Sequence, residues 1–144
     1  MGKSTLIVYK QSAVIPFREK SGRLLVLLIT ARNSGNWIVP KGLIEPGLSD
    51  RESAAMEALE EAGITGEVST RAVAQYSYNK WGGTCDVSVY LMKVKHELDD
   101  WLEKDERKRK WVRAEKAVGL VKRREIKDML EKLSNHIKTA EFVK

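Results

Sequence analysis

Three glutamates that lie close together on one predicted helix constrain this chain more than any other feature. Glu57, Glu60 and Glu61 occupy positions i, i+3 and i+4 in a segment that ends at Gly63. At about 100° per residue, their carboxylates project from one face of the helix. Like charges at this spacing repel one another, and a bound divalent cation that prefers oxygen ligands, such as Mg²⁺, is the usual compensation. The pattern therefore predicts a metal site that acts on phosphates.

Both ends of this helix can also be predicted. Ser49 and Glu52 have the spacing of a capping box, in which each residue bonds to the main chain of the other. Gly63 is typical of the residue that ends a helix in a left-handed conformation. We therefore expect a helix over residues 49–62. The face that should pack against a sheet consists of Ala55, Leu59 and Ala62.

Residues 42–64, GLIEPGLSDRESAAMEALEEAGI, resemble the Nudix box, the signature of the Nudix hydrolases. The preceding WIVPKG and the internal EPG also fit that family. The positions that match the signature are Gly42, Glu57, Ala58, Glu60, Glu61, Gly63 and Ile64. Two positions depart from it, because the first glutamate of the signature is replaced by Leu48 and its arginine by Met56.

The resemblance implies an α/β fold, with a mixed β-sheet sandwiched between α-helices, and a single domain over residues 1–144. It implies that Glu57, Glu60 and Glu61 are both catalytic residues and metal ligands, and that a main-chain carbonyl near Gly42 is a further ligand. The implied cofactor is Mg²⁺ or Mn²⁺. We expect Glu61 to act as the general base through a bound water, with Glu97 as the alternative.

The two departures alter the charge of the predicted site. In the family the arginine helps to hold the glutamates, so Met56 removes a cation from beside them and leaves more charge for metal ions to neutralise. Leu48 removes a carboxylate that usually supports the metal site. Glu45 is interpreted as a loop residue rather than a ligand.

Residues outside the box indicate the substrate. Within the Nudix hydrolases the chain is most similar to the diphosphoinositol polyphosphate and diadenosine polyphosphate phosphohydrolases, through WIVP at 37–40, DDW at 99–101 and RKRKWV at 107–112. This resemblance implies cleavage of phosphoanhydride bonds in small polyphosphorylated molecules. Where those relatives commonly have glycine, Lys41 places a cation in the path of the phosphates. The candidate phosphate contacts are Arg18, Arg32, Lys41 and Arg109.

Two other functions compete with this one. The Nudix fold also serves to remove pyrophosphate from RNA 5′ ends, although nothing in the chain resembles a dedicated RNA-binding module. Alternatively, the departures at Leu48 and Met56 could leave a catalytically weak protein that binds nucleotides without turnover. The three retained glutamates argue against a pure binder, which gains little from crowded carboxylates.

Composition narrows the class of protein. With 42% hydrophobic and 32% charged residues, the chain has the balance of a soluble globular domain. The single cysteine, Cys85, allows no intrachain disulfide, and the start MGKSTLIVYK lacks the apolar core of a signal peptide. We therefore expect a cytoplasmic protein without a membrane span. The net charge of +6 suits a polyanionic substrate, and nucleic acid remains possible as a less favoured partner.

Hydrophobic periodicity predicts the remaining elements. The dense basic block at residues 104–113 is interpreted mainly as a solvated face. The predicted strands cover residues 12–18, 24–31, 37–39 and 109–113, with a long hairpin of 68–78 and 84–94 around 81–83. The predicted later helices cover residues 114–121 and 123–137.

Overall fold

The computed structural model describes residues 7–143. The first residues, MGKSTL, in which the sequence predicts no signal peptide, lie outside the described part. The strands are β1 (Val8–Lys20), β2 (Arg23–Thr30), β3 (Trp37–Ile38), β4 (Lys41–Leu43), β5 (Ile64–Ser69), β6 (Ala74–Lys80), β7 (Gly83–Glu97), β8 (Arg109–Arg113) and β9 (Phe142–Val143). The helices are α1 (Asp50–Glu57), the π-helical turn η1 (Ala58–Ala62), α2 (Ala114–Leu120), α3 (Arg124–Glu131) and α4 (Leu133–Thr139).

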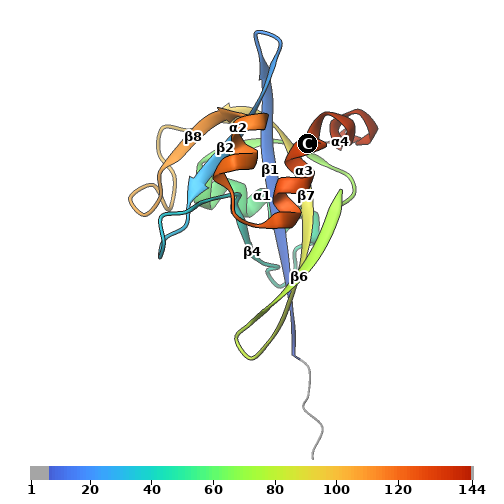
Figure 1. Cartoon of the computed structure of the whole chain (residues 1–144). Helices are drawn as coiled ribbons and strands as arrows, with labels where there is room; N and C mark the ends of the chain where they lie inside the picture. The colour runs from blue at the N-terminus through green and yellow to red at the C-terminus, as the bar shows by residue number, and fades with distance from the viewer. Residues whose placement is uncertain (1–6, 144) are drawn as a thin grey trace, which may run out of the picture.

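The strands form one mixed sheet around two long central strands (Figure 1). The central pair, β1 and β7, run parallel, with Val8 opposite Thr84 and Phe17 opposite Lys93. The other pairs are antiparallel: β2 and β4 flank β1, β5 and β6 flank β7, and β3, β8 and β9 extend the sheet from β2 and β5. The predicted mixed sheet is therefore confirmed.

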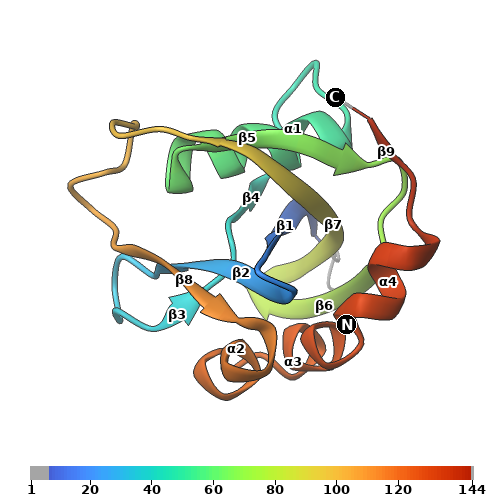
Figure 2. The ribbon, with the colours of Figure 1, turned by 90° about the horizontal axis from the view of Figure 1, so that it is seen from above.

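Helices cover the sheet on two sides, as the fold class predicts. Figure 2 shows α1 on one side of the strands and α2, α3 and α4 on the other. Alternate residues of the central strands feed two separate cores, as the period of two in a strand requires. Ile15 and Leu28 pack with the α2–α4 side, whereas Val14 and Leu27 pack with the α1 side. No helix in the described residues is long and apolar enough to cross a membrane.

The helix that carries the glutamates begins as predicted. The Ser49 side chain accepts a bond from the Glu52 N–H at 3.0 Å, and the Glu52 carboxylate accepts one from the Ser49 N–H at 2.9 Å. The last turn is π-helical rather than α-helical, and it ends at Gly63, whose φ of 67° is left-handed. Isolated π turns in α-helices often occur at functional sites. This turn contains Glu60 and Glu61.

The apolar face of this helix agrees with the prediction at Ala62 and differs from it elsewhere. The residues packed fully against the sheet are Ala54, Ala58 and Ala62, whereas Ala55 and Leu59 are only partly buried. The reason is that Glu57 and Glu61 do not face solvent: they are 8% and 6% exposed and point into the protein beside β4. The helix is therefore rotated relative to a simple arrangement with its polar face outward.

Two other elements were predicted too long. The segment expected as one strand from 68 to 78 divides at residues 70–73, because β5 and β6 pair with different parts of the long β7. The hydroxyl of Ser69 accepts the N–H of Leu91 at 3.1 Å at this division. The final helix also breaks, at Lys132, and α4 leads the chain to β9, which pairs with β5.

Candidate functional site

The site forms where the glutamate helix passes over β4. Gly42 lies so close to Glu57 that a Cβ atom at this position would overlap the Glu57 carboxylate. Glycine is therefore required here for close approach rather than for an unusual backbone angle. The contact brings the main chain of β4 and the carboxylate together, as the sequence prediction for Gly42 and Glu57 requires.

Glu61 is held from two sides. Its Oε1 accepts the main-chain N–H of Lys41 at 3.0 Å, and its Oε2 accepts a bond from Nη2 of Arg107 at 3.2 Å. Both charged side chains are nearly buried, with 8% of the glutamate and 6% of the arginine exposed. The Glu61 carboxylate is thus fixed in orientation.

A group of carboxylates suited to a metal ion lies next to Glu61. Oxygens of Glu45, Glu57 and Glu60 all fall within 4.8 Å of one another. Glu45 lies in a loop, as predicted, and its carboxylate nevertheless joins this cluster. Its N–H donates to the Ser53 hydroxyl at 3.2 Å, which anchors the loop over α1 and brings the Glu45 carboxylate to the other two.

Negative charge in this group is only partly compensated. Burial, followed by the nearby carboxylate of Glu61, raises the pKa of Glu57 to about 8. Burial also raises the pKa of Glu61, although Arg107 and the Lys41 N–H oppose the shift. The pKa of Glu60 is raised by burial and by Glu45. Raised carboxyl pKa values in one cleft are typical of functional sites.

The residues present fit a divalent cation. Three carboxylates offer hard oxygen ligands at close range, and burial together with neighbouring carboxylates, rather than any cation, sets the raised pKa of Glu57. Glu45, Glu57 and Glu60 are the side chains that could hold Mg²⁺ or Mn²⁺ directly. Glu61 adjoins them, and each of its oxygens accepts one bond from a protein donor.

Glu45, Glu57 and Glu61 line a cavity of about 580 Å³. Basic and aromatic residues also line it. The cavity is lined by Gln11, Arg32, Lys41, Gly42, Leu43, Ile44, Glu45, Pro46, Glu57, Glu61, Lys80, Trp81, Glu103 and Arg107. A cavity lined by both carboxylates and cations can accommodate a metal ion together with an anionic ligand.

Two of the four predicted phosphate contacts line this cavity. Lys41 is partly buried, and its Nζ donates to the Tyr78 hydroxyl at 2.8 Å. Burial, with the charges of Arg123 and Lys80 nearby, lowers the pKa of Lys41 to about 8. Arg32 also lines the cavity and pairs with the exposed Glu106 at 3.0 Å.

The other two predicted contacts, Arg18 and Arg109, do not line this cavity. Both pair with Glu97, at 3.7 and 3.4 Å, and both stack on tryptophans, Trp111 and Trp101. Arg109 also donates to the carbonyl of residue 62 at 2.8 Å. These arginines hold the end of β7 against β8, so we do not retain them, or Glu97, as site residues.

The sequence prediction missed Glu103 and Arg107. Both lie within or next to the block that was interpreted as a solvated face, yet the Arg107 side chain is 6% exposed. The i, i+4 spacing of the two residues was the available signal, since Nε of Arg107 pairs with Glu103 at 2.7 Å. Nothing in the sequence indicated that this pair meets Glu61.

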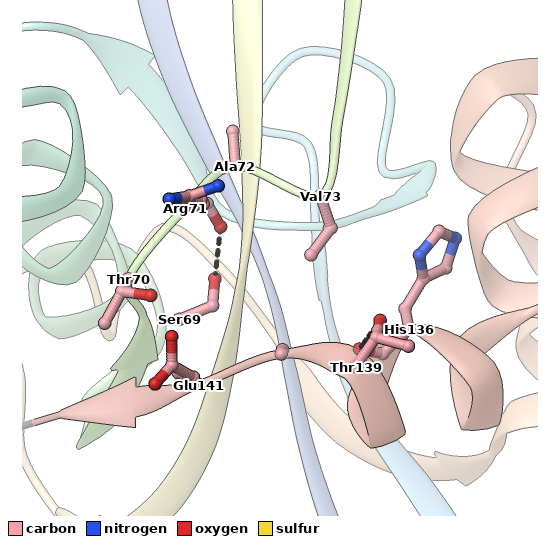
Figure 3. A pocket seen from close by; sticks show the side chains of 9 residues that line it. Ser69, Thr70, Arg71, Ala72, Val73, His136, Thr139 and Glu141 are labelled. Atoms are coloured by element: carbon pink, nitrogen blue, oxygen red, sulfur yellow. Dashed lines mark hydrogen bonds between the residues drawn. The ribbon is translucent and has the colours of Figure 1, made fainter.

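A second cavity, of about 360 Å³, lies away from the glutamates (Figure 3). It is formed by the β5–β6 connection and the end of α4. Its lining residues are Ser69, Thr70, Arg71, Ala72, Val73, His136, Thr139, Ala140 and Glu141. With Glu141 as its single carboxylate, it does not offer the ligand set found in the first cavity.

Comparison with known proteins shows the family of this chain. A family model described as NUDIX domain matches residues 8–133. The chain is 33% identical over 134 residues to Nudix hydrolase 16, mitochondrial, of Arabidopsis thaliana, a match that covers 81% of this chain and 74% of that protein. It is 30% identical over 114 residues to diphosphoinositol polyphosphate phosphohydrolase 3-beta of Bos taurus, a match that covers 78% of this chain and 68% of that protein. It spans 64% of the length of Nudix hydrolases 21 and 13 of Arabidopsis thaliana.

Solved structures show the same architecture. The crystal structure of a C. elegans Ap4A hydrolase superposes with a TM-score of 0.75 at 26% identity, covering 91% of this chain and 99% of that chain. A binary complex of a C. elegans Ap4A hydrolase superposes with a TM-score of 0.77 at 25% identity, covering 90% of this chain and 98% of that chain.

Proposed function

Because this chain belongs to the Nudix hydrolase family, we propose that it is a metal-dependent pyrophosphohydrolase of small polyphosphorylated molecules. The substrates proposed are diadenosine polyphosphates or diphosphoinositol polyphosphates, on which relatives act according to their names. The proposal is supported mainly by the cluster of Glu45, Glu57 and Glu60, two of which line a cavity that Lys41 and Arg32 also line. The proposed cellular location is the cytoplasm, which is consistent with the buried free thiol of Cys85.

The chemistry divides between the cation and the protein. A bound Mg²⁺ or Mn²⁺ supplies electrophilic stabilisation of the charge on the phosphate oxygens. Glu45, Glu57 and Glu60 hold it, together with main-chain oxygen near Gly42. Lys41 and Arg32 bind and orient the polyphosphate, whose oxygens are hydrogen-bond acceptors.

Glu61 is the proposed general base. The attacking water forms a bond to phosphorus, the bridging P–O bond breaks, and the proton of the water passes to the Glu61 carboxylate. Burial raises the pKa of Glu61, which makes it a stronger base than an exposed glutamate. The bonds from Lys41 N–H and Arg107 keep its carboxylate in place during the reaction.

The function is tested by turnover. Purified protein with Mg²⁺ should release products from diadenosine tetraphosphate or a diphosphoinositol polyphosphate, as followed by ³¹P NMR. Chelation by EDTA should stop the reaction, and Glu61→Gln should lower kcat on the order of 100-fold. Glu19→Gln, at an exposed strand end, is the matched control and should retain wild-type kcat. If none of a panel of substrates that includes these two compounds and triphosphorylated RNA is hydrolysed, the result would favour a binding protein. Hydrolysis of the RNA alone would favour the RNA 5′-pyrophosphohydrolase alternative.

The position of Trp81 favours diadenosine polyphosphates over diphosphoinositol polyphosphates as the substrate. It lines the cavity at the tip of the β6–β7 hairpin and is 51% exposed. Its φ of 55° is unusual for a bulky residue, and such strained positions occur at ligand sites. Tyr9 packs edge-on against its ring at 5.2 Å and supports the indole. An exposed aromatic ring beside a phosphate site can stack on a nucleobase.

If Trp81 stacks on a base, its removal should change KM for one substrate and not for the other. Trp81→Ala should raise KM for diadenosine tetraphosphate about tenfold, since stacking contributes roughly 1–3 kcal/mol per base. KM for a diphosphoinositol polyphosphate, which has no base, should stay unchanged. Trp81→Phe keeps an aromatic face and should recover most of the loss. Equal effects on both substrates would contradict a stacking role.

A further inference from the structure

The glutamate helix lacks a cation that the family signature has. Met56 stands where the signature has an arginine, one turn before Glu60, and it is partly buried. Without a substitute, the carboxylates of Glu57 and Glu61 would lie side by side with no cation in contact. Two buried carboxylates without a counter-cation destabilise a folded protein.

Arg107 occupies the position of such a counter-cation. Its guanidinium contacts three partners at once: Glu61 Oε2 at 3.2 Å, Glu103 Oε1 at 2.7 Å and the Thr30 carbonyl at 3.0 Å. It reaches the helix from the loop between β7 and β8, 46 residues beyond Glu61. Arginine suits this place because its planar fork presents several donors in fixed directions.

The loop that carries Arg107 is itself fixed to the helix. Nε1 of Trp101 donates to the Glu61 carbonyl at 3.1 Å, and the Glu103 N–H donates to the Glu60 carbonyl at 3.1 Å. The Thr30 carbonyl ties the same guanidinium to the end of β2. Arg107 is therefore set by three separate parts of the fold, and the Glu61 carboxylate is set by Arg107.

We propose that Arg107 is a positioning residue that supplies, from the β7–β8 loop, the cation that Met56 does not supply. It neutralises Glu61 and orients its carboxylate toward the cavity. The activity arm of this inference rests on the proposed function, whereas the stability arm does not.

Thermal unfolding of Arg107→Met tests the stability arm. Without metal, the variant should unfold at a lower temperature than the wild type, because Glu61 and Glu103 lose their cation. Saturating Mg²⁺ should raise Tm more in the variant than in the wild type, because the ion then neutralises charge that Arg107 had neutralised. Lys95→Met is the matched control: it breaks an exposed ion pair with Glu67, away from the cavity, and should change neither quantity measurably.

The activity arm uses kinetics and a rescue. Arg107→Met should lower kcat on the order of 100-fold, with KM changed less than about threefold, because a misplaced base affects the chemical step more than binding. Arg107→Lys should recover part of kcat. Adding Met56→Arg to Arg107→Met should restore metal-free Tm and raise kcat at least about tenfold, since the cation returns one turn before Glu60.

The outcomes separate the two proposals. If Arg107→Met has wild-type Tm, Mg²⁺ response and kcat, or if Met56→Arg restores none of them, Arg107 is not the replacement cation. If the wild-type protein turns over no substrate, the proposed function fails. The metal-free Tm and its response to Mg²⁺ then still decide the inference about Arg107.

Discussion

Gly42 shows how tightly a single residue limits this site. A methyl group there would overlap the Glu57 carboxylate, and β4 cannot move away without breaking its pairing with β1. Gly42→Ala should therefore displace Glu57 and lower kcat/KM on the order of 100-fold. Gly119→Ala is the control: its added methyl meets no atom within 4 Å, so activity should be unchanged. Wild-type activity in Gly42→Ala would contradict the close contact.

Glu57 should make stability depend on pH in metal-free protein. Its pKa is raised from 4.5 in the unfolded chain to about 8 in the fold, so between these values the folded state holds a proton that the unfolded state has lost. The free energy of unfolding must therefore fall as pH rises from about 4.5 to 8. Lys41, whose lowered pKa is also about 8, stays charged in both states below that pH and adds no slope there.

Thermal melts in EDTA between pH 5 and pH 8 measure this effect. We expect Tm to decrease across that range, and Glu57→Gln to flatten the decrease because the amide does not titrate. Saturating Mg²⁺ should also flatten it. A wild-type Tm that rises with pH across the range would contradict the raised pKa.

At the residue scale, the sequence predicted what is local. Glu57, Glu60 and Glu61 follow from helical spacing, and Gly42 follows from the family signature. Arg107 could not be predicted, because its contact with Glu61 joins residues 46 positions apart. Arg18 and Arg109 were predicted from their places at strand ends, but sequence does not show that Glu97 pairs with both.

Among the elements, the start of α1 offers the most direct test. Ser49→Ala removes the hydroxyl that accepts the Glu52 N–H. The free energy of unfolding should fall by about 1 kcal/mol, and Tm by roughly 2–4 °C. Ser49→Asp preserves an acceptor at the cap and should retain wild-type Tm. An unchanged Tm in Ser49→Ala would show that the cap contributes little.

Element type was easier to predict than element length. The capping box and Gly63 correctly marked both ends of the glutamate helix, because each is a local signal. The π turn within it carries no such signal. The short β4 and β9 were missed because a strand of two or three residues depends on its partner, here β1 or β5, for stability.

At the scale of the whole molecule, the sheet carries the site by its topology. The parallel pair of β1 and β7 forms the centre, and β4 returns antiparallel to β1, which brings Lys41 and Gly42 beneath α1. The apolar periodicity predicted a sheet between helices, and the layers confirm it (Figure 2). The rotation of α1 that buries Glu57 and Glu61 arises from packing among distant segments, which periodicity alone does not specify.

We propose that the carboxylates of Glu45, Glu57 and Glu60 bind one divalent cation. Titration of Mn²⁺ followed by electron paramagnetic resonance measures this binding directly, because protein-bound Mn²⁺ loses the sharp signal of the free ion. We expect saturable binding to the wild type, weakened at least about tenfold in Glu57→Gln, where one charged ligand is lost. Absence of binding, or equal affinity in the wild type and Glu57→Gln, would contradict it.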